Sequence, residues 1–188
     1  MPIVEVHILE GYDANEKKRL GHALTKAIKF VVSAVPEAIT VMLHEMTPDQ
    51  YFRGGEMRKP AAALTDPKEL VLSFLNSMQD RDLDTARSLL GEGFVMQFPG
   101  AEPMFELDEL LAWAAPRYQR VAKSYDGVDA WQGDGDAAVV YCRGTLSGEW
   151  LDGIAFDSIR FIDRFEVLDN KITRQDVWND IAEVKLKA

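Results

Sequence analysis

The chain has 188 residues, enough for one large domain or two small ones and too few for a barrel enzyme of ordinary size. Hydrophobic residues make up 47% and charged residues 28%, a balance typical of a globular protein with a packed core. The net charge of −10 argues against nucleic acid or an anionic membrane as a partner, because phosphate groups are bound by clustered lysine and arginine. Small molecules and other proteins remain.

The cysteine content and the start of the chain bear on where the protein works. A single cysteine, Cys142, excludes an intrachain disulfide and a zinc site built on cysteines. No leader with a basic and an apolar part follows Met1, and no apolar run is long enough to cross a membrane. We therefore expect a cytoplasmic protein, and no motif predicts a metal or an organic cofactor.

Acidic residues are unevenly distributed along the chain. Up to Arg58 there are 7 basic and 8 acidic residues, and beyond it there are 14 and 23. Glycines, prolines and small residues gather between the two parts, as they do in linkers. The sequence predicts a first domain over residues 1–58, a linker over residues 59–66 and a second domain over residues 67–188.

The first domain is predicted to be a strand, a helix and a second strand. Apolar residues alternate over residues 3–9, and after Asp13 and Glu16, a capping-box pair, they follow helical spacing. Pro36 is expected to stop this helix, and residues 39–46 predict a second strand, parallel to the first. Such a unit leaves a sheet face and both edges uncovered, so we expect copies of the chain to associate.

The second domain is predicted to begin with helices. Asp66 and Pro67 are typical of a helix start. A second helix is indicated by apolar residues at helical spacing, namely Leu83, Ala86, Leu89 and Leu90. A third is expected over residues 107–121, with a bend at Pro116.

Strands are predicted from Tyr125 onward, separated by glycine-rich turns and by a hairpin turn at Asp169-Asn170. Helices followed by a curved antiparallel sheet define an α+β domain. The fold class expected for the chain is therefore α+β, a β-α-β unit fused to a cone-shaped domain of helices packed on a sheet.

Residues 2–56 resemble the 4-oxalocrotonate tautomerase family. The resemblance is carried by Pro2-Ile3-Val4-Glu5-Val6-His7-Ile8-Leu9-Glu10-Gly11, by the helix after it, and by Glu45-Met46, Tyr51 and Gly54-Gly55-Glu56. It implies that Pro2, freed by removal of Met1, is the catalytic base, which moves a proton between carbon and the enol system of an α-keto acid. Burial and a nearby cation lower the pKa of such a secondary amine and leave it free to accept a proton.

The two arginines that bind substrate in this family are replaced here by Tyr12 and Thr40. Arg53 lies in the segment that lines the family's active site, where its guanidinium is either a replacement carboxylate ligand with a catalytic role or a solvated side chain. Tyr51 stands at the place of the family's aromatic wall, and Tyr12 either donates to a substrate carbonyl or caps the strand end. We take Tyr12, Thr40 and Tyr51 as candidates for substrate binding. The resemblance also implies a homo-oligomer, a hexamer or trimer of dimers.

Residues 67–180 resemble the nuclear transport factor 2-like superfamily, which includes ketosteroid isomerase and the SnoaL-like polyketide cyclases. The residues that carry this resemblance are Asp80-Arg81-Asp82-Leu83-Asp84, Phe98-Pro99-Gly100, Arg143-Gly144-Thr145-Leu146-Ser147-Gly148, Ile159-Arg160-Phe161-Ile162-Asp163-Arg164-Phe165 and Lys171-Ile172-Thr173. The superfamily hosts enzymes and non-enzymes, so it predicts a fold and leaves the function open.

Asp163 interrupts an apolar strand face made of Ile159, Phe161, Phe165 and Val167. Burial there raises the pKa of a carboxyl, so Asp163 is expected either to be a protonated acid lining a cavity or to pair with an arginine such as Arg143. The resemblance places Asp163 at the oxyanion-hole aspartic acid of ketosteroid isomerase, but Phe74 and Phe98 replace that enzyme's tyrosine and its base. Ketosteroid isomerisation is therefore not expected.

Three functional hypotheses follow. The first is a tautomerase-type isomerase acting through Pro2 on a small carbonyl acid, with Arg53 and Asp163 as further catalytic candidates. The second is a cyclase or isomerase acting in the second domain on a polyketide-like or aromatic substrate. The third is a non-enzymatic binding protein for small molecules, in which the first domain only assembles the chain.

Overall fold

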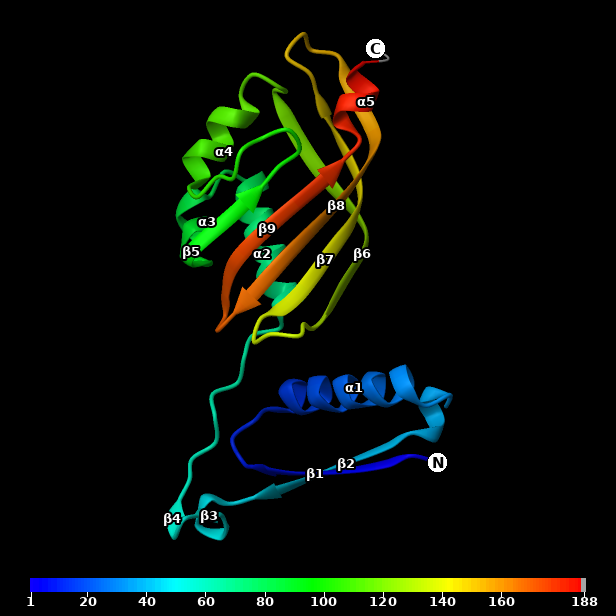
Figure 1. Cartoon of the computed structure of the whole chain (residues 1–188), viewed down its shortest axis with the longest axis vertical. Coiled ribbons are helices and arrows are strands. Elements are labelled where there is room, and N and C mark those ends of the chain that lie inside the picture. The colour runs from blue at the N-terminus through cyan, green and yellow to red at the C-terminus, as the bar shows by residue number, and fades with distance from the viewer. Residues whose placement is uncertain (187–188) are drawn as a thin grey trace. The chain divides into compact units, whose positions relative to one another are not determined.

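The computed structural model describes residues 1–186, which form two compact units. Unit 1 is Met1–Ala63, and unit 2 runs from Leu64 to the end of the chain (Figure 1). Within residues 1–186, no helix combines the length and the apolar composition needed to span a lipid bilayer.

Unit 1 is a β-α-β unit with a small hairpin at its end. Its elements are β1 (Ile3–Leu9), α1 (Ala14–Val31), β2 (Thr40–Met46), β3 (Phe52–Arg53) and β4 (Glu56–Met57), with short 3-10 turns at Pro36–Ala38 and Pro48–Gln50. The strands β1 and β2 are parallel and pair in register from Ile3–Thr40 to Leu9–Met46. Asp13 caps α1 through a capping box with Glu16, as predicted. The helix ends at Val31, before the proline expected to stop it.

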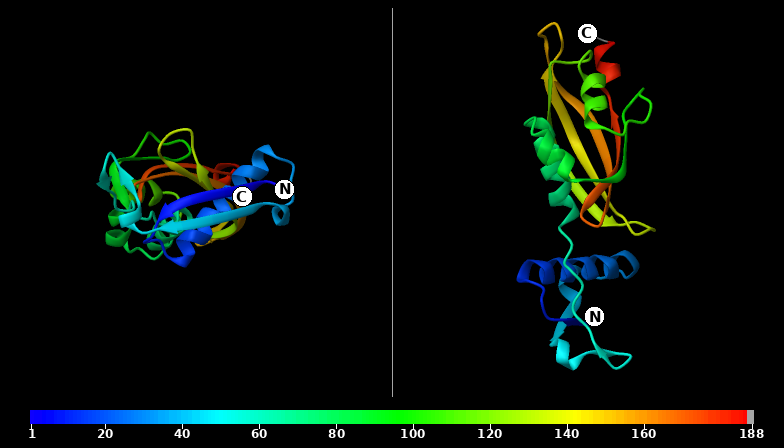
Figure 2. Two further views of the ribbon diagram at one scale, coloured as in Figure 1. Left: turned by 90° about the horizontal axis from the view of Figure 1, so that it is seen from below. Right: turned by 90° about the vertical axis from the view of Figure 1, so that its left-hand side faces the viewer.

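The sheet of unit 1 is covered on one face only. The helix α1 lies along one side of β1 and β2 (Figures 1 and 2). Val4, Val6 and Ile8 are half-buried, whereas Ile3, on the opposite face of the strand, is 60% exposed. Among the described residues 1–63, no side chain is fully buried. Unit 1 therefore has no closed hydrophobic core within one copy.

Unit 2 consists of helices packed on a curved five-stranded sheet (Figure 2). Its elements are α2 (Pro67–Gln79), α3 (Leu83–Ser88), β5 (Leu90–Gln97), α4 (Leu107–Ala114), β6 (Arg120–Gln132), β7 (Ala138–Glu149), β8 (Ala155–Leu168), β9 (Lys171–Asn179) and α5 (Ile181–Lys185). The strand order is β5-β9-β8-β7-β6. Four strands are antiparallel and β5 joins the edge in parallel with β9. The predicted α+β class is confirmed, with this parallel edge strand as a difference.

Two predicted helices are longer than the observed ones. The helix expected over residues 107–121 ends at Ala114, and β6 already begins at Arg120. Pro116 lies in the turn between them, because a proline inside a helix lacks the N–H donor and clashes with the preceding turn. The second helix ends at Ser88, and Leu90 starts β5 instead of extending the helix.

The turn between β8 and β9 is confirmed. Asp169 and Asn170 both have positive φ angles, 48° and 62°, as a tight hairpin turn of the primed type requires. In β7, Gly144 and Gly148 pass so close to the backbone of β6 that a β-carbon would collide with Ser124 O and Arg120 O. These two glycines allow β6 and β7 to approach each other where the sheet curves.

The two faces of this sheet differ in what covers them. The inner face packs against α2, α3 and α4 and contributes Val140, Cys142, Ile159, Phe161, Asp163 and Phe165, all buried. The outer face carries the alternate residues, including Trp131, Tyr141, Arg143, Ile162, Arg164 and Trp178. The predicted apolar face of the strand around Asp163 is thus confirmed as the inner face of β8.

Candidate functional site

Pro2 and Thr40 lie together at one end of the sheet of unit 1. Pro2 directly precedes β1, and the backbone N–H of Thr40 donates a hydrogen bond of 3.0 Å to the Pro2 carbonyl. This bond continues the parallel pairing of β1 and β2 beyond the first strand residue. The amine that would form on Pro2 after loss of Met1 therefore lies beside the start of β2.

Tyr51 and Arg53 lie at the opposite end of the same sheet. Both follow the carboxyl end of β2, whereas Pro2 stands before the amino end of β1 (Figure 1). A strand of the length of β1 separates these ends by about 20 Å. The structure therefore does not bring Pro2 and Arg53 together within one copy of the chain.

Arg53 is exposed on a two-residue hairpin. It pairs with Glu56 across the turn, and Gly54 and Gly55 between them have φ angles of +65° and +80°. Those angles are accessible to glycine at little cost, so the Gly-Gly pair sets the shape of the turn. The Arg53 guanidinium is therefore accessible from outside unit 1.

Arg58 belongs to the same cluster, although the sequence analysis did not single it out. Its backbone N–H donates to Tyr51 O at 3.4 Å, and its Nη2 lies 3.5 Å from Arg53 O. Two arginines therefore share this end of unit 1 with Tyr51. The pairing of β3 with β4 brings Arg58 next to Tyr51 and Arg53.

Tyr12 anchors the segment through which the chain leaves unit 1. Its hydroxyl donates a hydrogen bond of 2.9 Å to Ala61 O. The ring of Pro60 lies close to Gly11, whose φ of +126° requires glycine. The hydroxyl proton of Tyr12 is thus directed to the backbone of this segment. Tyr12, which replaces one of the two substrate-binding arginines of the family, thus holds the segment that leads out of unit 1.

A histidine pair on the open face of the sheet was not predicted. The rings of His7 and His44 stack with centroids 4.9 Å apart, because the two residues are in register in β1 and β2. His44 Nε2 lies 3.9 Å from Glu5 Oε2. These groups lie on the face that α1 does not cover.

In unit 2, Asp163 forms a buried ion pair with Lys123. Asp163 is 0% exposed on the inner face of β8, and its Oδ2 accepts a hydrogen bond from Lys123 Nζ. The ammonium group also lies over the ring of Phe161, 4.7 Å from its centroid. Burial raises the pKa of the Asp163 carboxyl, while the charge and the hydrogen bond of Lys123 act in the opposite direction.

Other polar groups surround this pair. The side chain of Gln175 lowers the pKa of Asp163 to a smaller extent. Asp163 Oδ1 and Gln175 Oε1 have no hydrogen-bond partner in the structure. Burial, assisted by the charge of Asp163, raises the pKa of Cys142 to about 12. Burial likewise raises the pKa of Tyr125. Both groups stay neutral at ordinary pH, so neither is a nucleophile in this state.

The alternative in which Arg143 pairs with Asp163 is wrong. Arg143 pairs with Asp129 on the outer face, because Cys142, and not Arg143, stands opposite Asp163 in the register of β7 and β8. Lys123 was missed because it falls between the helix predicted to end at residue 121 and the strands predicted from Tyr125 onward. In a strand beginning at Arg120, the alternation of Val121, Lys123 and Tyr125 would have placed Lys123 inside.

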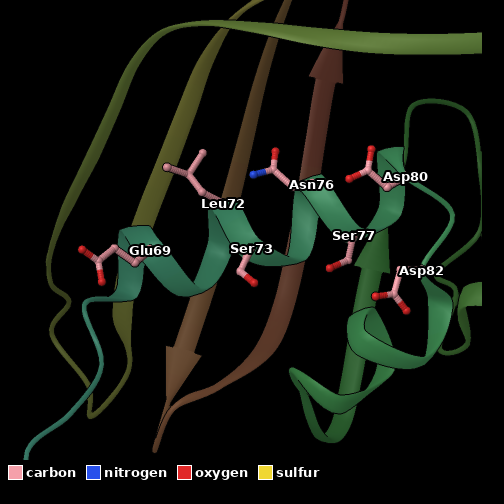
Figure 3. Close-up of a pocket in the computed structure, with 7 residues that line it drawn as sticks. All are labelled: Glu69, Leu72, Ser73, Asn76, Ser77, Asp80 and Asp82. Carbon is pink, nitrogen blue, oxygen red and sulfur yellow. The ribbon is translucent and has the colours of Figure 1, made fainter.

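A groove of about 510 Å³ runs along the solvent side of α2, away from the residues of α2 that face the core (Figure 3). Its lining is polar and acidic and consists of Glu69, Leu72, Ser73, Asn76, Ser77, Asp80 and Asp82. It includes none of the predicted site residues.

Comparison with known proteins identifies unit 1. The family described as "Tautomerase enzyme" matches residues 2–60. A probable tautomerase of Halalkalibacterium halodurans is 41% identical over 56 residues, which are 30% of this chain and 92% of the relative. One of Streptococcus mutans is 34% identical over 59 residues, 31% of this chain and 97% of the relative. The chain therefore belongs to the tautomerase family, of which unit 1 supplies almost a full-length member.

Unit 2 is similar to solved structures with the fold of nuclear transport factor 2. An NTF2-like protein of unknown function from Burkholderia pseudomallei matches with a TM-score of 0.53 and 14% identity, covering 64% of this chain and 95% of that one. TerC co-crystallised with polyporic acid matches with a TM-score of 0.53 and 18% identity, covering 64% and 97%. At this identity the likeness defines the fold only. The protein thus combines a tautomerase unit with an NTF2-like unit.

Proposed function

We propose that the protein is a tautomerase-type isomerase that uses Pro2 as general base on a small enol or keto carbonyl acid. The observation that carries the proposal is the family match that begins at Pro2, together with the position of Pro2 at the start of β1. After removal of Met1, the ring nitrogen is a secondary amine with a free electron pair. It accepts a proton from the enol or carbon acid and returns the proton to another atom of the substrate, so no cofactor is consumed.

A second copy of the chain supplies the cation in this proposal. Pro2 and Arg53 lie at opposite ends of the β1–β2 sheet in one copy, so the guanidinium that binds the substrate carboxylate comes from Arg53 of a neighbouring copy. The open sheet face and the lack of a buried side chain among residues 1–63 support association of unit 1 into a homo-oligomer. Thr40 then lies beside the base, and Tyr12 and Tyr51 belong to the arginine end.

The test compares the intact mass and the activity of purified protein. Mass spectrometry is expected to show loss of Met1, and the wild type is expected to ketonise an enolised arylpyruvate. Replacement of Pro2→Ala removes the secondary amine and is expected to lower kcat/KM by about 10²–10⁴-fold, the contribution of a positioned general base. Retention of Met1 together with undiminished activity would refute the proline mechanism.

A second candidate function is a cyclase or isomerase reaction in unit 2 on a polyketide-like or aromatic substrate. The buried Asp163–Lys123 pair favours it, since Asp163 and Gln175 each carry an acceptor oxygen without a partner, which a donor group of a ligand would satisfy. Asp163→Asn keeps the shape of the side chain and separates the two candidates. Loss of turnover in Asp163→Asn with full activity in Pro2→Ala would place the reaction in unit 2. No turnover of any enol, α-keto acid or aromatic substrate would favour the binding-protein hypothesis.

A further inference from the structure

Two acceptor oxygens at the buried ion pair of unit 2 have no hydrogen-bond partner. Oδ2 of Asp163 accepts a hydrogen bond from Lys123 Nζ, but Oδ1 of the same fully buried carboxyl has no partner. Gln175, which lowers the pKa of Asp163 and therefore lies near it, is 3% exposed, and its Oε1 is also unpartnered. Buried polar atoms are almost always hydrogen-bonded, because each loses its bonds to water on folding. Two unpartnered acceptors at one place indicate that a hydrogen-bond donor is missing there.

The ion pair contributes little to stability that an apolar pair would not. Burial removes the hydration of both charges, and apolar residues of similar volume usually stabilise a fold as well or better. The neighbouring side chains would suit such a replacement, since Phe161 is 3% exposed and Tyr125 packs edge-on against it with ring centroids 6.0 Å apart. Cys142, opposite Asp163 in the strand register, is fully buried. A carboxyl and an ammonium group at this place therefore indicate a chemical role.

Lys123 is accessible from solvent, whereas Asp163 is not. The Lys123 side chain keeps 19% of its accessible surface and the Asp163 side chain 0%. The backbone N–H of Lys123 donates to Gln79 Oε1 at 3.4 Å, which places the lysine beside the end of α2. Its ammonium group lies over the ring of Phe161, 4.7 Å from the centroid. An apolar molecule that enters from solvent would meet the amine and an aromatic surface together.

Asp163 is positioned to take the proton that keeps Lys123 from acting as a nucleophile. An amine attacks carbon through its free electron pair, which the ammonium form lacks. Transfer of one proton from Lys123 Nζ to Asp163 Oδ2 leaves a neutral amine and a neutral acid, which avoids the cost of two buried charges. Burial raises the pKa of Asp163 and so favours its acid form. Tyr125 and Cys142 stay neutral and do not compete for this proton.

We propose that Lys123 forms an imine with an uncharged aldehyde or ketone that carries an apolar group such as an aromatic ring. Carbonyl acids are disfavoured, because a second carboxylate at this place would be repelled by Asp163. The carbonyl compounds taken by Lys123 therefore differ in class from those acted on by Pro2. The site does not depend on the proline mechanism.

Atoms and charge balance in this step. The Nζ electron pair forms the N–C bond, the carbonyl oxygen takes the proton of Asp163, and one proton of the nitrogen returns to the carboxylate. The new hydroxyl is a donor for the free acceptors Asp163 Oδ1 or Gln175 Oε1. The C–O bond then breaks, the oxygen leaves as water with the proton of Asp163, and the nitrogen electron pair completes the C=N bond. The protonated imine stays opposite the Asp163 carboxylate, so the pair keeps its charges.

The first test is reductive trapping in the full chain. Benzaldehyde and sodium cyanoborohydride convert an imine into a stable benzylamine, and digestion followed by tandem mass spectrometry locates the benzyl group. Lys123 is expected to be labelled at least about tenfold faster than Lys18, an exposed lysine of α1. Labelling of Lys123 no faster than that of Lys18 would overturn the proposal. An adduct on Pro2 lies in a different peptide, so failure of the proline mechanism and failure of this proposal are read separately.

A pH series tests the part played by Asp163. The neutral fraction of an exposed lysine falls about tenfold for each pH unit below its pKa, whereas proton transfer inside the pair does not involve solvent. The ratio of Lys123 to Lys18 labelling is therefore expected to rise about tenfold from pH 8 to pH 7 in the wild type. In Asp163→Asn the amide cannot take the proton, so this ratio is expected to stay constant.

The matched control for this series is Asp129→Asn. It removes a carboxylate that pairs with Arg143 on the outer face, and it is expected to behave like the wild type. A constant ratio in the wild type, or an equal rise in folded Asp163→Asn, would overturn the role of Asp163 and with it the proposal. Far-UV circular dichroism identifies a variant that fails to fold, and the wild-type series then decides by itself.

Discussion

Apolar side chains are hidden to very different degrees in the two units. In unit 2, Phe74, Phe165 and Ile172 are each at most 1% exposed and belong to one hydrophobic core under the helices. In unit 1, Phe30 is 93% exposed and none of the described residues 1–63 is buried. Because burial of apolar surface is the main favourable contribution to folding, unit 2 can be stable in one copy, whereas unit 1 depends on association.

The tryptophans allow the two units to be observed separately. All four, Trp113, Trp131, Trp150 and Trp178, lie in unit 2. Tryptophan fluorescence therefore reports on unit 2 alone, while far-UV circular dichroism reports on both units.

The largest expected effect is on the core of unit 2. Phe165→Ala leaves a cavity among Phe74 and its neighbours and is expected to lower the free energy of unfolding by about 3–5 kcal/mol. The measurement is urea unfolding followed by tryptophan fluorescence. Leu151→Ala, in an exposed loop, is the control and is expected to change stability by less than about 0.5 kcal/mol. If Phe165→Ala also removed the activity of unit 1 at low urea, the two units would not be independent.

Removal of the partner of Asp163 is expected to cost a similar amount. Lys123→Met leaves the carboxyl buried without a cation and is expected to destabilise unit 2 by about 3–5 kcal/mol at neutral pH. The double variant Lys123→Met with Asp163→Leu removes both charges and is expected to recover most of this loss. Failure of the double variant to recover would show that the pair is needed for packing and not for charge balance.

The pH dependence of unit 2 follows from the same carboxyl. The pKa of Asp163 is raised above its ordinary value of 3.8 in the folded state, so the folded state binds this proton more tightly than the unfolded state. Its contribution to stability is therefore present below pH 3.8 and is lost as the pH rises through the raised pKa. Asp163→Asn is expected to remove this slope from a plot of fluorescence-detected stability against pH. A slope that is unchanged in Asp163→Asn would assign it to other groups.

A smaller effect is expected at the arginine end of unit 1. If Arg53 binds the substrate carboxylate, Arg53→Ala should lower kcat/KM roughly 10- to 150-fold. This factor corresponds to a loss of about 1.5–3 kcal/mol of transition-state binding. Arg58→Ala, in the same hairpin region, is the matched control and separates a specific contact from a general loss of positive charge. Equal small losses in both variants would mean that Arg53 is a solvated side chain.

The smallest effect is expected from dilution. Each tenfold dilution weakens an association by about 1.4 kcal/mol for each copy released, so unit 1 should lose helical signal at low concentration. In contrast, the urea midpoint of unfolding of unit 2, followed by tryptophan fluorescence, should depend less on protein concentration than the helical signal of unit 1. Light scattering at micromolar concentration gives the mass of the species present. A monomer that keeps the full circular dichroism signal would contradict the dependence of unit 1 on association.

The sequence predicted elements that depend on local signals. The capping box at Asp13 and the turn at Asp169-Asn170 are formed by neighbouring residues, and both are as predicted. The strand β5 was missed because it contains Gly91 and Gly93 and is held by pairing with the distant β9. Local composition carries little information about such a contact.

The candidate site was harder to predict for a similar reason. Alternation along β8 was enough to place Asp163 inside, but its partner Lys123 lies two strands away and required the correct start of β6. The resemblance grouped Pro2 with Arg53, and a sequence gives no sign that a single copy holds them at opposite ends of a sheet. A site that copies build together is visible only once the fold of one copy is known.

The glycines of β7 restrict which sequences this sheet can accept. Gly144 and Gly148 meet the carbonyl oxygens of Ser124 and Arg120, which belong to the backbone and cannot turn aside as a side chain could. Alanine, the smallest replacement, already collides at both positions. Folded variants selected after random mutagenesis of β7 should therefore carry various residues at the outward-facing Thr145 and Ser147. They should keep glycine at positions 144 and 148. The close approach of β6 and β7 thus leaves two positions of the chain at which glycine is the residue that fits.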